Sequence, residues 1–306
     1  MCAVVLAAPT VLAPGDTRFT AVDLGFSAER ALGHASHLAE VIGPRPAGSD
    51  SERRAAYDIA DTFRAAGYSP VVQPFPLPNG RRSQNVIAVK PGARGKHRDD
   101  VLVIGAHYDG KGPTCPGADD NGSGIGVLLE LARILKPVCL FFTIKFVAFG
   151  AEEMIDVNKD HHHYGSRHYV QEYRRARSHS SPIVGMICID MVGVGPRMYA
   201  RSLGVGDQFL VQAVLRQAKR AGVAASSLRD PGWSDHEPFE KAGIPSVWIE
   251  RRPSPGYHTS HDTADRLKTP YLTQTGLLVL NTILGLDQPA LRQRALRGQT
   301  WRGKQP

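Results

Sequence analysis

The feature that most constrains the fold of this 306-residue chain is the alternation of short apolar runs with segments of helical periodicity. A short apolar run rich in β-branched residues predicts a buried strand, and apolar residues at three- and four-residue steps predict an amphipathic helix. Strands are expected at 84–90, 101–106, 138–149, 183–189 and 246–250, and helices at 27–42, 49–66, 124–135, 165–177, 207–221 and 272–286. The alternation predicts an α/β fold of three layers, in which a largely parallel sheet carries helices on both faces.

The predicted elements form one unit along the chain, because no linker rich in Pro, Gly or Ser and no internal repeat divides them. We therefore expect a single domain over residues 17–287, within the size that α/β domains reach. Residues 1–16 are an apolar segment that is similar to the middle and end of a signal peptide, although the first basic residue is Arg18. This segment predicts export to the cell envelope or beyond, with a cytoplasmic location as the alternative. Residues 288–306 are expected to form a basic, disordered tail.

The net charge of +8 does not by itself indicate a nucleic-acid partner. Five of the positive charges lie close to the C-terminus without an acidic residue among them: Arg292, Arg294, Arg297, Arg302 and Lys304. Because no nucleic-acid recognition motif accompanies them, a solvated tail and no nucleic-acid partner are expected. No run reaches the roughly 18 uninterrupted apolar residues of a membrane helix. The four cysteines have no CxxC spacing, so neither a thiolate zinc site nor a disulfide framework is expected.

Carboxylates and imidazoles follow the predicted strands, at the edge where ligands bind in open α/β sheets. They are His107 and Asp109 after the strand at 101–106, Asp119 and Asp120 in the next glycine-rich loop, Glu152 and Glu153 after 138–149, Asp190 after 183–189, and His258 after 246–250. Two imidazoles with several carboxylates and no thiolate suit Zn²⁺, Mn²⁺ or Co²⁺. Each of these motifs, taken alone, can be explained without a metal. Several buried carboxylates together are costly without a cation. Together they predict a metal centre that activates water.

Six motifs along the chain make this prediction more specific: GAHYDG, PGADDNGSG, FGAEE, IDMVG, SDHEPF and YHTSHDT. Their order and approximate spacing resemble those of the zinc aminopeptidases with two co-catalytic metals, the family of aminopeptidase Y and the secreted bacterial leucyl aminopeptidases. The resemblance covers roughly residues 85–267. It implies a metallo-aminopeptidase that acts on peptides with a free N-terminus and binds two Zn²⁺ ions.

The resemblance also implies a ligand set for the two metals: His107 and Asp190 for the first, Glu153 and His258 for the second, with Asp120 bridging them. This assignment is physically reasonable. Two cations about 3.5–4 Å apart need a shared carboxylate to reduce their repulsion, and together they activate one water and polarise one carbonyl group.

Three further residues receive roles from the same resemblance. Glu152 matches the general base, which takes a proton from the water and passes it to the leaving amine. Asp109 is expected to accept a hydrogen bond from the second ring nitrogen of His107. Tyr257 matches a tyrosine that stabilises the oxyanion, while Asp119 is expected to lie outside the metal ligands.

Other polar residues near these motifs have weaker assignments. In SDHEPF, Asp235 and His236 match positions that support the metal ligands in the family, but a helix cap would explain Ser234 and Asp235 almost equally well, and both explanations stay open. His261 and Asp262 are expected to make loop hydrogen bonds rather than bind metal. Cys115 lacks an evident base and is not expected to act as a nucleophile.

One segment departs from the family pattern: residues 154–164, with three consecutive histidines, separate the glutamate pair from the helix that follows. A solvated insertion is expected, with a lid over the substrate pocket or an adventitious metal site as the alternatives. A long segment at this place is also typical of glutaminyl cyclases, related enzymes that use one zinc. The stretches DDNGSGIGVLLELARIL and EPFEKAGIP favour the peptidases over the cyclases. A non-catalytic binding domain is not favoured, because all five expected ligands are present.

Overall fold

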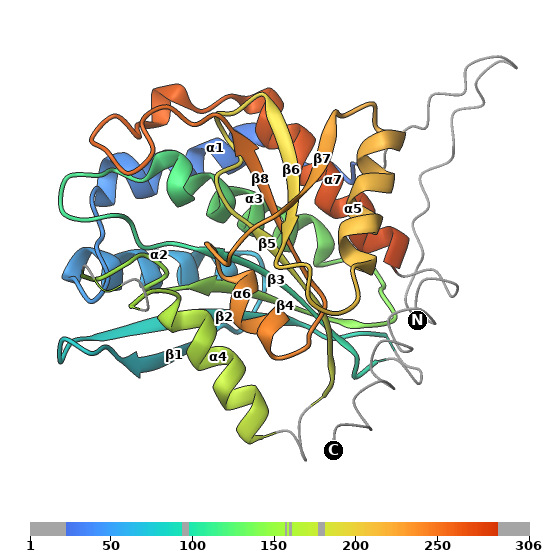
Figure 1. Cartoon of the computed structure of the whole chain (residues 1–306), viewed down its shortest axis with the longest axis horizontal. Helices are drawn as coiled ribbons and strands as arrows, with labels where there is room; N and C mark the ends of the chain where they lie inside the picture. Colours follow the sequence, from blue (N-terminus) through green and yellow to red (C-terminus); the bar gives the residue numbers. More distant parts are fainter. Residues whose placement is uncertain (1–22, 94–97, 157, 159–160, 177–180, 287–306) are drawn as a thin grey trace, which may run out of the picture.

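The computed structural model describes residues 23–93, 98–156, 158, 161–176 and 181–286. The apolar segment at 1–16 and the basic tail at 288–306 lie outside the described residues. At the centre is one eight-stranded sheet with the order β1-β2-β4-β3-β5-β8-β6-β7 (Figure 1). Its strands are β1 (Val71–Pro76), β2 (Arg82–Lys90), β3 (Val101–His107), β4 (Thr143–Phe149), β5 (Ile183–Ile189), β6 (Arg197–Ser202), β7 (Ala225–Arg229) and β8 (Ser246–Arg252).

The four central strands β4, β3, β5 and β8 are mutually parallel. On one side β2 runs antiparallel to β4 and β1 antiparallel to β2, and on the other β6 runs antiparallel to β8 and parallel to β7. Every residue of β3 is buried, as expected for a parallel strand covered on both faces. The predicted α/β class with a largely parallel sheet is confirmed.

Helices cover both faces of the sheet (Figure 1). They are α1 (Ala28–Ser36), α2 (Asp50–Ala65), α3 (Gly124–Leu135), α4 (Tyr164–Arg175), α5 (Phe209–Arg220), α6 (His236–Lys241) and α7 (Thr269–Leu286), with short helical turns at His37–Ile42, Ala118–Ser123 and Ala264–Arg266. The larger core joins α1, α2, α3, α5 and α7 to one face, and the smaller core joins α4 and α6 to the other. In β3, Leu102 and Ile104 enter the first core and Val101 and Val103 the second, which is the two-residue alternation of a strand.

The strand predicted at 138–149 is shorter in the structure and begins at Thr143. The reason is pairing: Thr143 lies opposite Val101, the first residue of β3, so earlier residues have no partner strand on that side. The sequence gives no strong signal for β1, β6, β7 and α6. The edge strand β7 is largely exposed and β1 contains Pro74, so neither shows an apolar run.

The sequence from Ser49 to Glu52 has the spacing of a helix capping box, and the structure forms one of the two hydrogen bonds of that motif at the start of α2. Ser49 Oγ accepts a hydrogen bond from the Glu52 N–H at 3.0 Å, as expected. The Glu52 carboxylate does not return the bond to Ser49: it is buried and accepts from Gly48 N–H, Ser83 Oγ and Ala151 N–H at 2.6, 2.6 and 3.1 Å. Glu52 therefore joins α2 to the turn that precedes the glutamate pair.

Arg45 is the main link between the N-terminal helices and two loops at the sheet edge. Its side chain is fully buried and donates hydrogen bonds to the backbone carbonyls of Tyr108, Leu38, Gly43, Pro116 and Gly117. Tyr108 precedes Asp109, and Gly117 begins the loop that carries Asp120. One guanidinium thus holds both loops in place.

Replacing Arg45 with lysine is expected to lower the free energy of unfolding by about 3 kcal/mol or more, because a lysine cannot reach five carbonyl groups and leaves buried acceptors unpaired. Denaturant unfolding measures this change. Arg53→Lys is the matched control, since Arg53 is exposed and pairs with Asp50 on the surface; its effect should stay within about 0.5 kcal/mol. Equal unfolding midpoints for the two variants would contradict the role of Arg45.

Candidate active site

The residues expected at the metal centre come together at one edge of the sheet. His107 ends β3, Glu152 and Glu153 follow β4, and Asp190 directly follows β5. His258 lies in the loop after β8, and Asp120 in the turn before α3. The carboxyl ends of parallel strands share this edge, which explains why residues 151 positions apart can meet there.

The first group of ligand atoms surrounds His107. Its Nε2 lies 3.5 Å from Asp190 Oδ1, 3.2 Å from Asp120 Oδ1 and 3.9 Å from Glu152 Oε2. His107, Glu152 and Asp190 are buried, and they offer ligand atoms within 4.8 Å of one another. These three residues can hold a metal ion as a set.

The second group surrounds His258. Its Nε2 lies 3.0 Å from Glu153 Oε1 and 3.1 Å from Asp120 Oδ2. Asp120 therefore directs one oxygen to the imidazole of His107 and the other to the imidazole of His258. That is the arrangement which a carboxylate needs in order to bridge two metal ions.

The electrostatics of both groups suit a cation. Asp120 Oδ2, Glu153 Oε1 and Asp190 Oδ1 are buried and have no hydrogen-bond partner within the described part of the chain. Although burial alone would lower it, the carboxylates of Glu152 and Asp190 raise the pKa of His107 well above its ordinary value. Such a concentration of negative charge in a buried site requires positive charge, which Zn²⁺ ions can supply to imidazole and carboxylate ligands.

Asp109 lies close to His107, as expected, but its shortest hydrogen bonds are made to other groups. It was expected to bond to His107, and the distance from His107 Nδ1 to Asp109 Oδ1 is 3.5 Å. Its two oxygens instead accept the backbone N–H groups of Glu152 at 2.9 Å and Glu153 at 3.1 Å. Asp109 thus fixes the backbone of the glutamate pair, whose side chains reach different metal groups.

The loop before α3 separates its two neighbouring aspartates. The Asp119 carboxylate accepts hydrogen bonds from Gly193 N–H and Ser254 Oγ, each at 2.7 Å, and lies outside both metal groups. Asp262 accepts the backbone N–H groups of Asp119 and Asp120 at 2.7 and 3.0 Å, a loop-holding contact of the expected kind. Burial raises the pKa of the Cys115 thiol to about 12, so this cysteine is a poor nucleophile at neutral pH.

The SDHEPF motif supports Asp190 rather than capping a helix. Ser234 Oγ donates to Asp190 Oδ2 at 2.7 Å. Asp235 stands at the N-cap of α6, but its side chain makes no capping hydrogen bond. His236 Nε2 lies 3.2 Å from Asp230 Oδ2 inside the fold. The capping explanation for Asp235 is therefore wrong.

Tyr257 stacks on the imidazole of its neighbour His258, with ring centroids 3.6 Å apart, and the Arg252 guanidinium lies 4.8 Å from the tyrosine ring. The side chains of Tyr257 and Arg252 line a cavity of about 640 Å³ above the two sets of candidate metal ligands. Trp233 and Met154 add apolar surface to its wall. This volume is in the range of small-ligand sites and can admit the end of a peptide.

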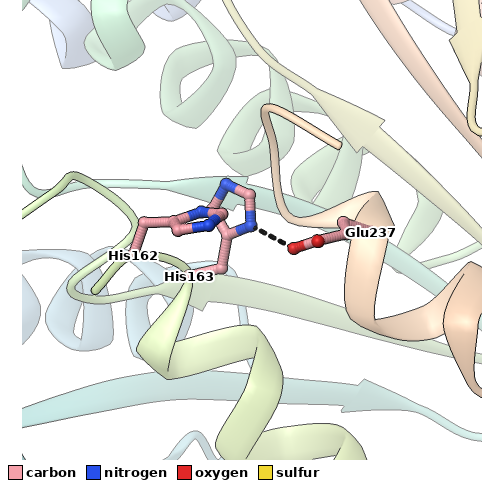
Figure 2. Close-up of side chains that lie close together, drawn as sticks. All are labelled: His162, His163 and Glu237. Atoms are coloured by element: carbon pink, nitrogen blue, oxygen red, sulfur yellow. Dashed lines mark hydrogen bonds and ion pairs between the residues drawn. The ribbon is translucent and has the colours of Figure 1, made fainter. Parts of the chain in front are cut away.

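The segment expected to be a solvated insertion contributes a buried residue that the sequence interpretation missed. His161 is partly exposed and pairs with Asp156 at 2.6 Å. His163 is only 2% exposed and lies between Glu152 and Glu237. Figure 2 shows His162 and His163 beside Glu237, which belongs to α6. A run of histidines resembles a polar loop, and no local pattern in the sequence signals its contact with a residue 74 positions away.

Comparison with known protein families gives a match over residues 85–283, to the model described as Peptidase family M28. Among curated proteins, Aminopeptidase YwaD of Bacillus subtilis is 36% identical over 227 residues. The aligned region covers 71% of this chain and 48% of YwaD, so the chain spans about half the length of that relative.

Solved structures show the same fold. BSAP, a zinc aminopeptidase from Bacillus subtilis, superposes with a TM-score of 0.77 at 23% identity, covering 88% of this chain and 97% of that one. A glutaminyl cyclase from Fimbriiglobus ruber superposes with a TM-score of 0.75 at 22% identity, covering 90% and 99%. Among the described residues, none of the helices is long and apolar enough to cross a membrane.

Proposed function

Because this chain belongs to peptidase family M28, we propose that it is a metal-dependent aminopeptidase that hydrolyses the first peptide bond of peptides with a free N-terminus. The observation that carries the proposal is the position of Asp120. Its two oxygens lie 3.2 Å from His107 Nε2 and 3.1 Å from His258 Nε2, as a ligand shared by two Zn²⁺ ions requires.

In this proposal His107 and Asp190 hold one zinc, Glu153 and His258 hold the other, and Asp120 bridges them. When bound, the two ions would lower the pKa of a water molecule and polarise the scissile carbonyl. These five side chains come from separate strand ends and loops that meet at one edge of the sheet.

Glu152 is proposed to take the proton from the attacking water and deliver it to the leaving amine. Burial and the neighbouring carboxylates raise its pKa well above the ordinary value, which suits a group that must accept a proton. Tyr257 is proposed to stabilise the developing oxyanion from the wall of the cavity. Asp109 holds the backbone of Glu152 and Glu153 in place.

A glutaminyl-peptide cyclase is the second candidate, supported by the structural likeness to the cyclase from Fimbriiglobus ruber. Cyclisation uses the substrate's own amine as nucleophile, and one metal suffices to polarise the side-chain amide. The second metal group, formed by Asp120, Glu153 and His258, is complete in this chain and favours the peptidase.

The zinc-loaded protein is expected to release free N-terminal residues from unblocked peptides and aminoacyl anilides, and to contain close to two zinc ions per chain. N-acetylated forms of the same peptides serve as the control and should stay intact. Ammonia release from N-terminal glutaminyl peptides without peptide-bond cleavage, together with one zinc per chain, would establish the cyclase instead.

We infer export from the apolar segment at 1–16, so the peptides would be met outside the cytoplasm. Fractionation of cells that produce the full chain tests this location. Recovery of the protein only in the cytoplasmic fraction would contradict it.

A further inference from the structure

His163 connects the candidate base to a second carboxylate. Its Nε2 lies 2.9 Å from Glu152 Oε1. On the other side of the ring, its Nδ1 lies 2.8 Å from Glu237 Oε2, the contact drawn in Figure 2. All three residues are buried, with exposed fractions of 2% for His163, 6% for Glu152 and 4% for Glu237. Both ring nitrogens of the imidazole are therefore occupied by carboxylates on opposite sides.

The backbone fixes His163 in this position. Its N–H donates to the Glu152 carbonyl at 2.8 Å, and its own carbonyl accepts from Arg167 N–H at 2.9 Å in the first turn of α4. His163 is the N-cap of that helix and has the left-handed conformation, with φ of 54°. The segment that follows the glutamate pair thus folds back so that His163 faces Glu152.

Glu237 determines the direction of its own hydrogen bond with His163. The hydrogen bonds of His163 and Lys241 hold the pKa of Glu237 down at about 2, although burial alone would raise it. An ionised carboxylate can only accept, so His163 Nδ1 carries a proton and donates it to Glu237. Arg167 lies 3.6 Å from the same carboxylate. With two cationic side chains already beside Glu237, the cluster of His162, His163 and Glu237 is better suited to hydrogen bonding than to binding a third metal.

The position of Glu152 raises a chemical difficulty. Its Oε2 is 3.9 Å from His107 Nε2, and it lies close enough to His107 and Asp190 to bind the same metal ion as they do. A carboxylate that ligates the metal gives up a lone pair and becomes less basic, so it is a poor base for the water. Something must therefore hold Glu152 away from the metal.

We propose that His163, oriented by Glu237, holds the Glu152 carboxylate out of the metal coordination sphere and directs it at the reacting water. His163 is thus a positioning residue, which acts through Glu152. This inference rests on the proposed function, and it assigns a specific role to a residue of the segment that was expected to be a solvated insertion.

Two substitutions of His163 separate its two contacts. The side-chain amide nitrogen of glutamine corresponds in position to His Nε2, so His163→Gln can keep the bond to Glu152. That of asparagine corresponds to His Nδ1, so His163→Asn can keep only the bond to Glu237. Asparagine tolerates the left-handed conformation of this position better than glutamine does, so backbone strain would disfavour glutamine. If kcat falls more in His163→Asn than in His163→Gln, the difference therefore reports on the contact with Glu152.

We expect His163→Asn to lower kcat about 10- to 100-fold, the usual effect of losing a group that orients a ligand or base, with KM changed less than about twofold. His163→Gln should recover most of this activity, and zinc content should stay at the wild-type level in both. The control is His161→Asn in the same histidine run: in the described part of the chain, the ring of His161 hydrogen-bonds to Asp156 and Asn158 of its own loop, so wild-type kcat is expected. Unchanged kcat in His163→Asn, or a parallel loss of zinc, would overturn the inference.

A second measurement does not depend on turnover. Protein loaded with Co²⁺ alone shows visible absorption bands that weaken when a further ligand joins the metal. His163→Asn should weaken these bands because Glu152 then binds, and the added substitution Glu152→Gln should abolish this change. Identical spectra for wild type and His163→Asn would refute the inference. If the wild-type protein released no N-terminal residues, the proposed function would fail, while the Co²⁺ spectra would still decide the role of His163.

Discussion

Replacing Asp120 with asparagine is expected to empty both metal positions and to abolish turnover. Asp120 is the residue whose two oxygens face both imidazoles, at 3.2 Å from His107 Nε2 and 3.1 Å from His258 Nε2. Asparagine offers one oxygen and no negative charge, so it can neither bridge two cations nor reduce their repulsion. Elemental analysis of the purified variant, alongside an anilide assay, measures both consequences.

The matched control is Asp119→Asn, one residue earlier in the same loop. Asp119 accepts from Gly193 N–H and Ser254 Oγ, and burial raises its pKa to about 7. An uncharged side chain is therefore tolerated there, and the Ser254 hydroxyl can rotate to accept from the new amide. Metal content close to wild type is expected. If Asp120→Asn kept its zinc, the bridging role would be refuted; equal losses in both variants would instead mean that the loop had misfolded.

The centre of the fold could be predicted because its strands are buried on both faces. The predicted bounds of the strand at 183–189 and of the helix at 124–135 coincide with β5 and α3. A buried strand must be apolar along its whole length, so composition reveals it. The edge strands β1 and β7 bury little surface, and their sequences carry no corresponding constraint.

The expected metal ligands could be found from sequence for a related reason. Each follows a strand or a glycine-rich turn, and the topology of a parallel sheet brings such positions to one edge. The contacts of Arg45, Glu52 and His163 could not be found in this way. They join residues 63, 99 and 74 positions apart through side-chain packing that no local pattern encodes.

Replacing Glu152 with glutamine is expected to lower kcat by about 10²–10⁴-fold while zinc content stays at the wild-type level. Glutamine has the same shape, and its amide oxygen can still accept a hydrogen bond from His163, so the cavity should keep its structure. It cannot take a proton from water. Steady-state kinetics and elemental analysis of the same preparation separate the loss of the base from any loss of metal.

Glu153→Gln is the matched comparison for Glu152→Gln, because it makes the same chemical change one residue later. The backbone N–H groups of Glu152 and Glu153 are both held by Asp109, so the two variants share their anchors and differ only in the direction of the side chain. Glu153 Oε1 lies 3.0 Å from His258 Nε2, and its substitution should therefore reduce metal content. If instead Glu152→Gln lost zinc and Glu153→Gln kept it, the base and the ligand would be exchanged. In that case His163, which contacts Glu152, would support a metal ligand rather than a base.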